Sequence, residues 1–141
     1  MMDTLLVLDL VLLSHLPRPA GMVVFLNRGQ SDVRIWERGN RWGDTALAFE
    51  LIRNGQVSRI VRREQVYTRN VPSSVTVPAG ARHEWPFDLG DGEWESDGWD
   101  DRSVAPGAQL VAVYSVPASP EALDHGVHSG QLLSEAISLD E

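Results

Sequence analysis

The sequence predicts an all-β chain that folds as one antiparallel β-sandwich of about seven to nine strands, with one short helix near residues 120–125. Short apolar runs alternate with Gly, Pro, Asn and Asp along most of the chain. Within many runs, apolar and polar residues alternate with the period of two that strands require. A small β-barrel is the second interpretation of the same pattern.

Length and composition favour a single domain over residues 1–141. A chain of this size buries roughly two thirds of its unfolded surface, which is enough for a core without cross-links. The sequence has no cysteine, which excludes disulfides, thiolate metal sites and cysteine nucleophiles. It also has no lysine, which excludes Schiff-base chemistry and the lysine of a phosphate-binding loop.

The first residues, MMDTLLVLDLVLLSHL, are apolar but do not resemble a signal peptide or a membrane span. They lack a positive n-region and a small-residue cleavage pattern, and Asp3 and Asp9 interrupt them. The apolar stretch is also shorter than the roughly 20 residues of a spanning helix. We therefore expect a strand buried on both faces, no membrane association and a cytoplasmic location.

The later strands are justified by their periodicity and their turns. Asn54-Gly55 lies between two apolar runs and predicts a two-residue hairpin turn. Pro86 cannot donate a ladder hydrogen bond, so its strand should lie at a sheet edge. Leu110–Val116 is apolar on both faces and should be central. The runs are Met22–Leu26, Val33–Trp36, Leu47–Leu51, Val57–Val61, Val75–Val77, His83–Leu89, Leu110–Val116 and Leu133–Leu139.

One segment has helical signals at both ends. Ser119 can cap a helix, Pro120 suits its first position, and Glu121 favours the positive end of the helix dipole. Gly126 can terminate it after one or two turns. The segment therefore predicts a short helix within a connection.

The turn pattern resembles that of bacterial immunoglobulin-like domains. The residues that carry the resemblance are Asn27 before a Gly turn, Pro78-Ala79-Gly80, and Ala105-Pro106-Gly107 before a strand. The chain is loosely similar to the intracellular proteinase-inhibitor type over residues 5–116. It lacks the Asn-Pro-Thr-Thr-Gly loop of the chagasin-like inhibitors. The resemblance implies an immunoglobulin-like sandwich and no particular activity.

Charge is segregated along the chain. Residues 18–82 hold eleven of the twelve arginines and five acidic residues, whereas residues 83–141 hold one arginine and thirteen acidic residues. The fold should therefore present an arginine-rich face and an acidic face or loop. Arg59 and Arg63 should point one way on their strand and Arg62 the other, so they form no single stripe. This arrangement and the pI near 4.9 argue against nucleic-acid binding.

The acidic stretch from Glu84 to Asp101 is a candidate calcium site. Eight carboxylates within this stretch could surround a hard cation, and the candidate ligands are Asp91, Glu93, Glu95 and Asp97. The spacing imitates the first half of an EF-hand loop, but Val104 occupies the position of the bidentate glutamate. A solvated acidic loop is the alternative.

The sequence contains no motif that is typical of an enzyme. The histidines are His15, His83, His125 and His128, and their spacing predicts loop residues better than a zinc site. There is no nucleophile elbow and no Gly-rich phosphate loop. We expect a protein that is not an enzyme and needs no cofactor.

Two loops are candidate partner-binding surfaces. Trp94 and Trp99 could serve as apolar anchors inside an acidic rim that includes Asp97 and Asp100. The Pro-stiffened loop Tyr67–Ser74 would present Arg69 and Asn70 to a partner or a protease.

The sequence thus predicts a non-enzymatic binding or interaction module whose protein partner is basic. Self-association of the arginine face with the acidic face is a further prediction. The alternatives are a proteinase inhibitor, an immunity-type toxin inhibitor, and a calcium-dependent binder of carbohydrate or protein.

Overall fold

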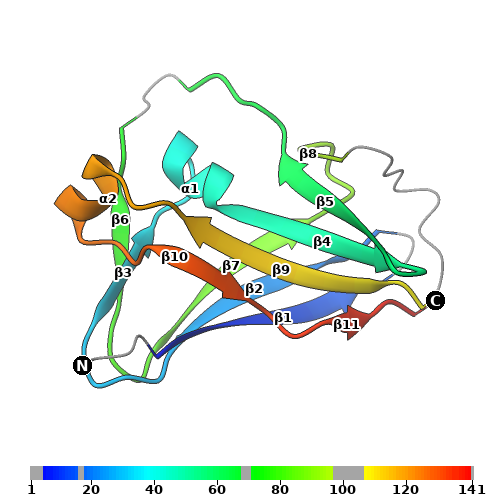
Figure 1. Ribbon diagram of the computed structural model, residues 1–141, viewed down its shortest axis with the longest axis horizontal. Helices are drawn as coiled ribbons and strands as arrows, with labels where there is room; N and C mark the ends of the chain where they lie inside the picture. Colours follow the sequence, from blue (N-terminus) through cyan, green and yellow to red (C-terminus); the bar gives the residue numbers. More distant parts are fainter. Residues whose placement is uncertain (1–4, 16–17, 68–70, 97–106, 141) are drawn as a thin grey trace.

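The computed structural model describes residues 5–15, 18–67, 71–96 and 107–140. These residues form eleven strands and two short helices (Figure 1). In chain order the elements are β1 (Leu6–Ser14), β2 (Ala20–Asn27), β3 (Val33–Trp36), α1 (Arg41–Ala46), β4 (Leu47–Arg53), β5 (Gln56–Arg62), β6 (Ser74–Val77), β7 (Arg82–Asp88), β8 (Trp94–Glu95), β9 (Gln109–Val116), α2 (Pro120–His125), β10 (Gly130–Leu133) and β11 (Ile137–Ser138).

Two antiparallel sheets pack face to face as a β-sandwich (Figure 1). The larger sheet has the strand order β10-β9-β4-β5-β8, and β11 also pairs with β9. The smaller sheet has the order β1-β2-β7, and β3 and β6 form a separate ribbon. The predicted all-β sandwich is confirmed. The described chain has more strands than expected, because β8 and β11 are two residues long and too short to show a period in sequence.

The core between the sheets is rich in aromatic rings. Phe25 of β2 lies 5.0 Å from Trp85 of β7 and 4.9 Å from Tyr114 of β9, measured between ring centroids. The Tyr114 hydroxyl accepts a hydrogen bond of 3.0 Å from the backbone N–H of Trp36, which ties β3 to the larger sheet. Trp36 and Trp85 are both buried.

The Asn54-Gly55 turn joins β4 to β5 as predicted. Arg53 pairs with Gln56, so the loop has two residues. Asn54 has φ of 50° and Gly55 has φ of 77°, so both adopt the left-handed conformation of a type I′ turn. The local sequence therefore specified this hairpin correctly.

Two predictions of strand position are confirmed. β9 contains Leu110–Val116 and pairs with β4 on one side and with β10 and β11 on the other. Its residues are almost all buried, as expected for a central strand. β7 contains Pro86 and is an edge of the smaller sheet, pairing with β2 alone among the described strands.

The prediction that the first strand is buried on both faces is wrong. Leu6, Leu8 and Leu10 of β1 lie in the core, whereas Asp9 and Val11 on the opposite face are exposed. β1 is an edge of the smaller sheet, and the outer face of that sheet points away from the core. The apolar residues on both faces suggested double burial, but tertiary packing covers only one of them.

The predicted helix is present as α2, and α1 was not predicted. Ser119 caps α2 through a hydrogen bond to the backbone N–H of Ala122, and Gly126 ends it with φ of 65°. Asn40 caps α1 in the same way through the N–H of Gly43. A six-residue helix is too short to show a period of 3.6 in the sequence. Among the described residues, no helix has the length and apolar character needed to cross a bilayer.

Candidate functional site

Arg62 places a charged group at one end of the core. Ile60 is fully buried, and Arg62 shares its phase on β5 because side chains two residues apart lie on the same face of a strand. The Arg62 guanidinium carbon lies 5.7 Å from the centroid of the Trp94 ring. Its Nε atom is buried and has no hydrogen-bond partner among the described residues. A buried donor without an acceptor is uncommon in a folded protein and marks this position as a candidate site.

Arg38 brings a second guanidinium to the same place. It lies in the loop before α1, 5.7 Å above the Trp85 ring, and donates a hydrogen bond to the Pro86 carbonyl. Burial lowers the pKa of Arg38, and the positive charge of Arg62 lowers this pKa further. The fold therefore holds two like charges near each other over two tryptophan rings.

Asp44 of α1 is a buried carboxylate beside the two arginines. Its Oδ1 accepts a hydrogen bond from the N–H of Gly39, and its Oδ2 accepts one from the Tyr67 hydroxyl at 2.9 Å. Burial and this hydrogen bond raise the pKa of Tyr67 to about 12. Asp44 raises the pKa of Arg38 by Coulomb attraction, but neither arginine forms an ion pair with a carboxylate in the described ranges.

We call these six residues the arginine–tryptophan site: Arg38, Asp44, Arg62, Tyr67, Trp85 and Trp94. A small cavity at the site has a volume of about 10 Å³, roughly the space of one water, and it is lined by Arg38, Gly43, Asp44, Leu47, Arg62, Trp85 and Trp94. A ligand group that enters it must therefore be small, such as one oxygen of a carboxylate or phosphate.

The chemistry of the site favours anions. A guanidinium is a donor-only group with five N–H bonds in a planar fork, which matches the two oxygens of a carboxylate. The tryptophan rings hold the two arginines by cation–π contact, and their faces are only weak acceptors for N–H donors. Hydrogen bonds between a guanidinium and an anion are among the strong ones in proteins.

Trp94 is not the exposed partner anchor that the sequence predicted. It is only 3% exposed, and its ring lies 5.2 Å from the ring of Phe49 in an edge-to-face contact. The loop folds back so that β8 pairs with β5 and directs Trp94 into the core. The other predicted partner-binding residues lie outside the described residues, and they are Arg69, Asn70, Asp97, Trp99 and Asp100.

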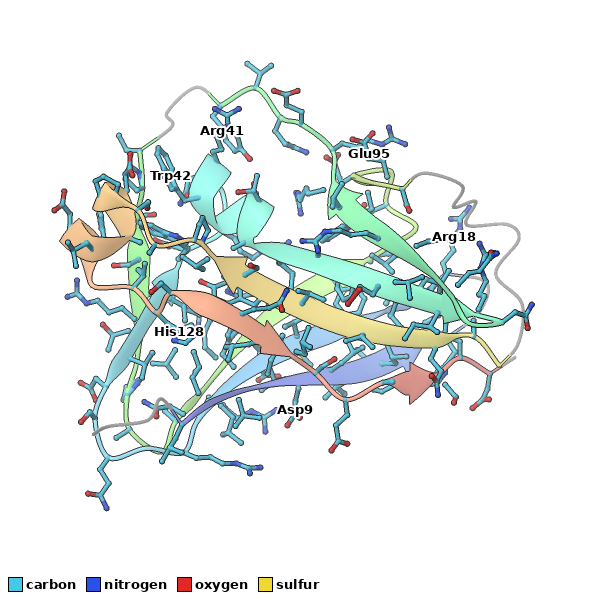
Figure 2. The ribbon with its side chains drawn as sticks, viewed as in Figure 1. Asp9, Arg18, Arg41, Trp42, Glu95 and His128 are labelled. Carbon is cyan, nitrogen blue, oxygen red and sulfur yellow. The ribbon has the colours of Figure 1, made fainter. Side chains whose placement is uncertain are left out.

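The carboxylates that were predicted to bind calcium and that the structure describes interact with other residues of the same chain. Asp91 accepts a hydrogen bond from the backbone N–H of Glu93, and the Glu93 carboxylate accepts one from Gln65. Glu95, at the end of β8 in Figure 2, forms an ion pair of 3.2 Å with Arg63. Within the described ranges no three His, Asp or Glu side chains gather as a metal site, and Asp97 lies outside those ranges.

The histidines near α2 do not form a zinc site among the described residues. His125 packs against Trp36 with 5.3 Å between ring centroids. His128 lies between α2 and β10 (Figure 2) and is partly buried. Its Nε2 atom is buried and has no hydrogen-bond partner in the part of the chain that the structure describes. Burial lowers the pKa of His128 below its ordinary value of 6.5.

This depressed pKa predicts a loss of stability in acid. The unfolded state binds more protons than the folded state between the two pKa values, so stability falls as the pH decreases from 6.5 toward the folded value. Replacing His128 with glutamine removes this dependence of stability on pH, because glutamine does not bind a proton in this range. We expect the wild-type Tm to drop relative to that of His128→Gln between neutral pH and about pH 5. Thermal unfolding across this range measures the difference, and parallel curves for the two proteins would contradict it.

The sequence contained a signal for one half of the arginine–tryptophan site. The phase of β5 separates Arg62 from Arg59 and Arg63, and an arginine on the core-facing phase after Ile60 is unusual. Arg38 gave no such signal, because it lies in a loop whose path depends on the packing of α1. Only the fold brings these two arginines together.

The fold and the site define an all-β sandwich with two arginines held over tryptophan rings at one end of its core. No family model matches the chain, and neither a curated protein nor a solved structure matches it. The immunoglobulin-like relationship and the cytoplasmic location stay predictions.

Proposed function

We propose that this protein is a non-enzymatic binding module whose arginine–tryptophan site receives a carboxylate of an acidic protein segment. The observation that carries the proposal is the buried, unpartnered Nε of Arg62 beside the second guanidinium of Arg38. A carboxylate would supply the missing acceptor and would neutralise two neighbouring positive charges.

The proposal keeps the interaction module predicted from sequence and changes the charge of its partner. A basic partner was expected because Trp94 and Trp99 were interpreted as anchors inside an acidic rim. Trp94 is buried, whereas Trp99 and the rim residues Asp97 and Asp100 lie outside the described residues. Both arginines come from the arginine-rich part of the chain, residues 18–82. The narrow cavity suits the end of an Asp or Glu side chain, or a chain terminus, better than a bulky group.

A peptide titration tests this proposal. The probe is a glutamate-rich peptide, and the same peptide with glutamine in place of glutamate is its uncharged counterpart. Binding is followed through the NMR signals of the Arg62 Nε–H and the Trp94 indole. We expect saturable shifts with the glutamate peptide alone. We expect Arg62→Met to weaken binding by about 10- to 100-fold, because charged hydrogen bonds contribute about 1.5–3 kcal/mol.

A matched control separates the site from general electrostatic attraction. Methionine at position 62 keeps an apolar stem over Trp94, while Arg28→Met removes the same charge from an exposed turn. Arg28→Met should bind the peptide nearly as the wild type does. Equal weakening by both variants, or equal binding of the two peptides, would refute a specific carboxylate site.

A further inference from the structure

The outer face of the larger sheet is unusually apolar. On β4, β5 and β9 the core-facing residues, such as Phe49, Ile60 and Ala112, alternate with residues that point away from the core. Antiparallel sheets of a sandwich commonly place polar residues on this solvent side. Here Ala48, Val111 and Val113 lie outside the main core cluster and are nevertheless buried.

Cross-strand pairing makes this apolar surface continuous across four adjacent strands. Leu133 of β10 is opposite Val113 of β9, Val113 is opposite Ala48 of β4, and Ala48 is opposite Val61 of β5. A second apolar row on the same face, separated from the first by one row, pairs Ile52 with Val57. Leu133 is 55% exposed, Val57 is 57% exposed and Val61 is 36% exposed, so these three side chains are open to a partner, whereas Ala48, Val111 and Val113 are already buried within the chain. We call this surface the valine face: Ala48, Ile52, Val57, Val61, Val111, Val113 and Leu133.

A balanced pair of charges lies between these apolar rows. Glu50 of β4 is opposite Arg59 of β5, and Glu50 is also opposite Val111 of β9. The charges of Glu50 and Arg59 cancel within the face, and Glu95, which is opposite Val61 at the β8 edge, forms an ion pair with Arg63, although the chain carries a net charge of −8. Two copies could therefore approach through this face without placing uncompensated like charges against each other.

We propose that the valine face is the interface of a homodimer in which two larger sheets pack face to face about a two-fold axis. A two-fold axis places each patch against its own copy, so Glu50 of one protomer can face Arg59 of the other. Because the face carries one charge of each sign, a second copy of the same face matches it better than a uniformly acidic or uniformly basic partner does. The exposed side chains of Val57, Val61 and Leu133 then bury against the second copy as in sheet-on-sheet packing.

This interface differs from the predicted contact between the arginine face and the acidic face. A contact made by opposite charged faces should weaken as salt rises, because screening reduces the attraction. A dimer made by the valine face should persist in high salt, since its apolar rows do not depend on charge attraction. It is also independent of the arginine–tryptophan site, because Arg62 and Arg59 lie on opposite faces of β5.

Sedimentation velocity of the full chain at several protein concentrations tests the proposal. We expect a dimer for the wild type at low and high salt. Val57→Glu and Leu133→Glu should each give a monomer that retains a cooperative thermal transition. Leu123→Glu is the matched control, because Leu123 is 83% exposed on α2, outside the valine face, and should leave the dimer intact. A wild-type monomer, a dimer that dissociates in salt, or a dimer that survives both glutamate variants would overturn the proposal.

A charge exchange tests the position of the two-fold axis. Glu50→Arg places two positive charges at the centre of the interface and should shift the protein to monomer. Adding Arg59→Glu restores the opposite signs within each chain and between chains, so the double variant should recover the dimer. Failure of the double variant to recover it, while its Tm matches that of the wild type, would overturn the proposed pairing.

Discussion

Replacing Phe49 with alanine is expected to lower the free energy of unfolding by about 3–5 kcal/mol, the usual cost of removing a large buried aromatic side chain. Phe49 has no exposed surface and lies in the middle strand of the larger sheet. Its ring centroid is 4.6 Å from that of Phe87 and 5.2 Å from that of Trp94. Alanine would leave a cavity between the two sheets that these rings cannot fill without moving.

Urea unfolding at one fixed protein concentration measures this loss. Phe49→Leu is the matched control, because it keeps most of the apolar volume and should cost clearly less than alanine. Trp94 rests on Phe49, so the alanine variant should also change tryptophan fluorescence in the folded state. Equal stability of the wild type and Phe49→Ala would show that this position is not packed in the core.

Replacing Asn27 with alanine is expected to lower the free energy of unfolding by about 2–4 kcal/mol, because it breaks several buried hydrogen bonds at once. Asn27 is 1% exposed at the end of β2. Its Nδ2 donates to the carbonyls of Ser31 and Val77, at 2.9 and 3.0 Å, and its Oδ1 accepts from the N–H of Gly29. Alanine would leave the buried Val77 carbonyl without this donor.

The check is urea unfolding of Asn27→Ala beside Asn54→Gly. Asn54 is an exposed turn residue with φ of 50°, a conformation that glycine adopts without strain, so Asn54→Gly should change stability by less than about 1 kcal/mol. Similar losses in both variants would contradict the structural role assigned to the buried asparagine. The comparison separates the side-chain hydrogen bonds of Asn27 from a general effect of replacing asparagine.

Strand β5 illustrates how the two proposals share one element. Its core-facing phase ends in Arg62, which lies over Trp94 in the arginine–tryptophan site. Its opposite phase carries Val57, Arg59 and Val61 on the valine face. Period-two alternation therefore supplies a charged group to one end of the core and an apolar row to the surface. Variants on one face can be tested without removing residues from the other.

Local patterns determined most of the secondary structure. Asn54-Gly55 specified the β4–β5 hairpin because both residues tolerate the left-handed conformation of its turn. Pro86 specified an edge strand because it has no N–H to donate. Ser119 and Gly126 specified the ends of α2 through capping. In each case the structure was specified by the backbone chemistry of the residue itself or by its hydrogen bond to a residue a few positions away.

Tertiary structure alone decided which faces were covered and which charges met. Whether β1 was buried on one face or two depended on its position at the edge of the smaller sheet. Trp94 became a core residue because β8 pairs with β5, a contact between segments distant in sequence. Arg38 and Arg62 became neighbours for the same reason. Periodicity reports the direction of a side chain relative to its own strand, and packing between elements determines what lies in that direction.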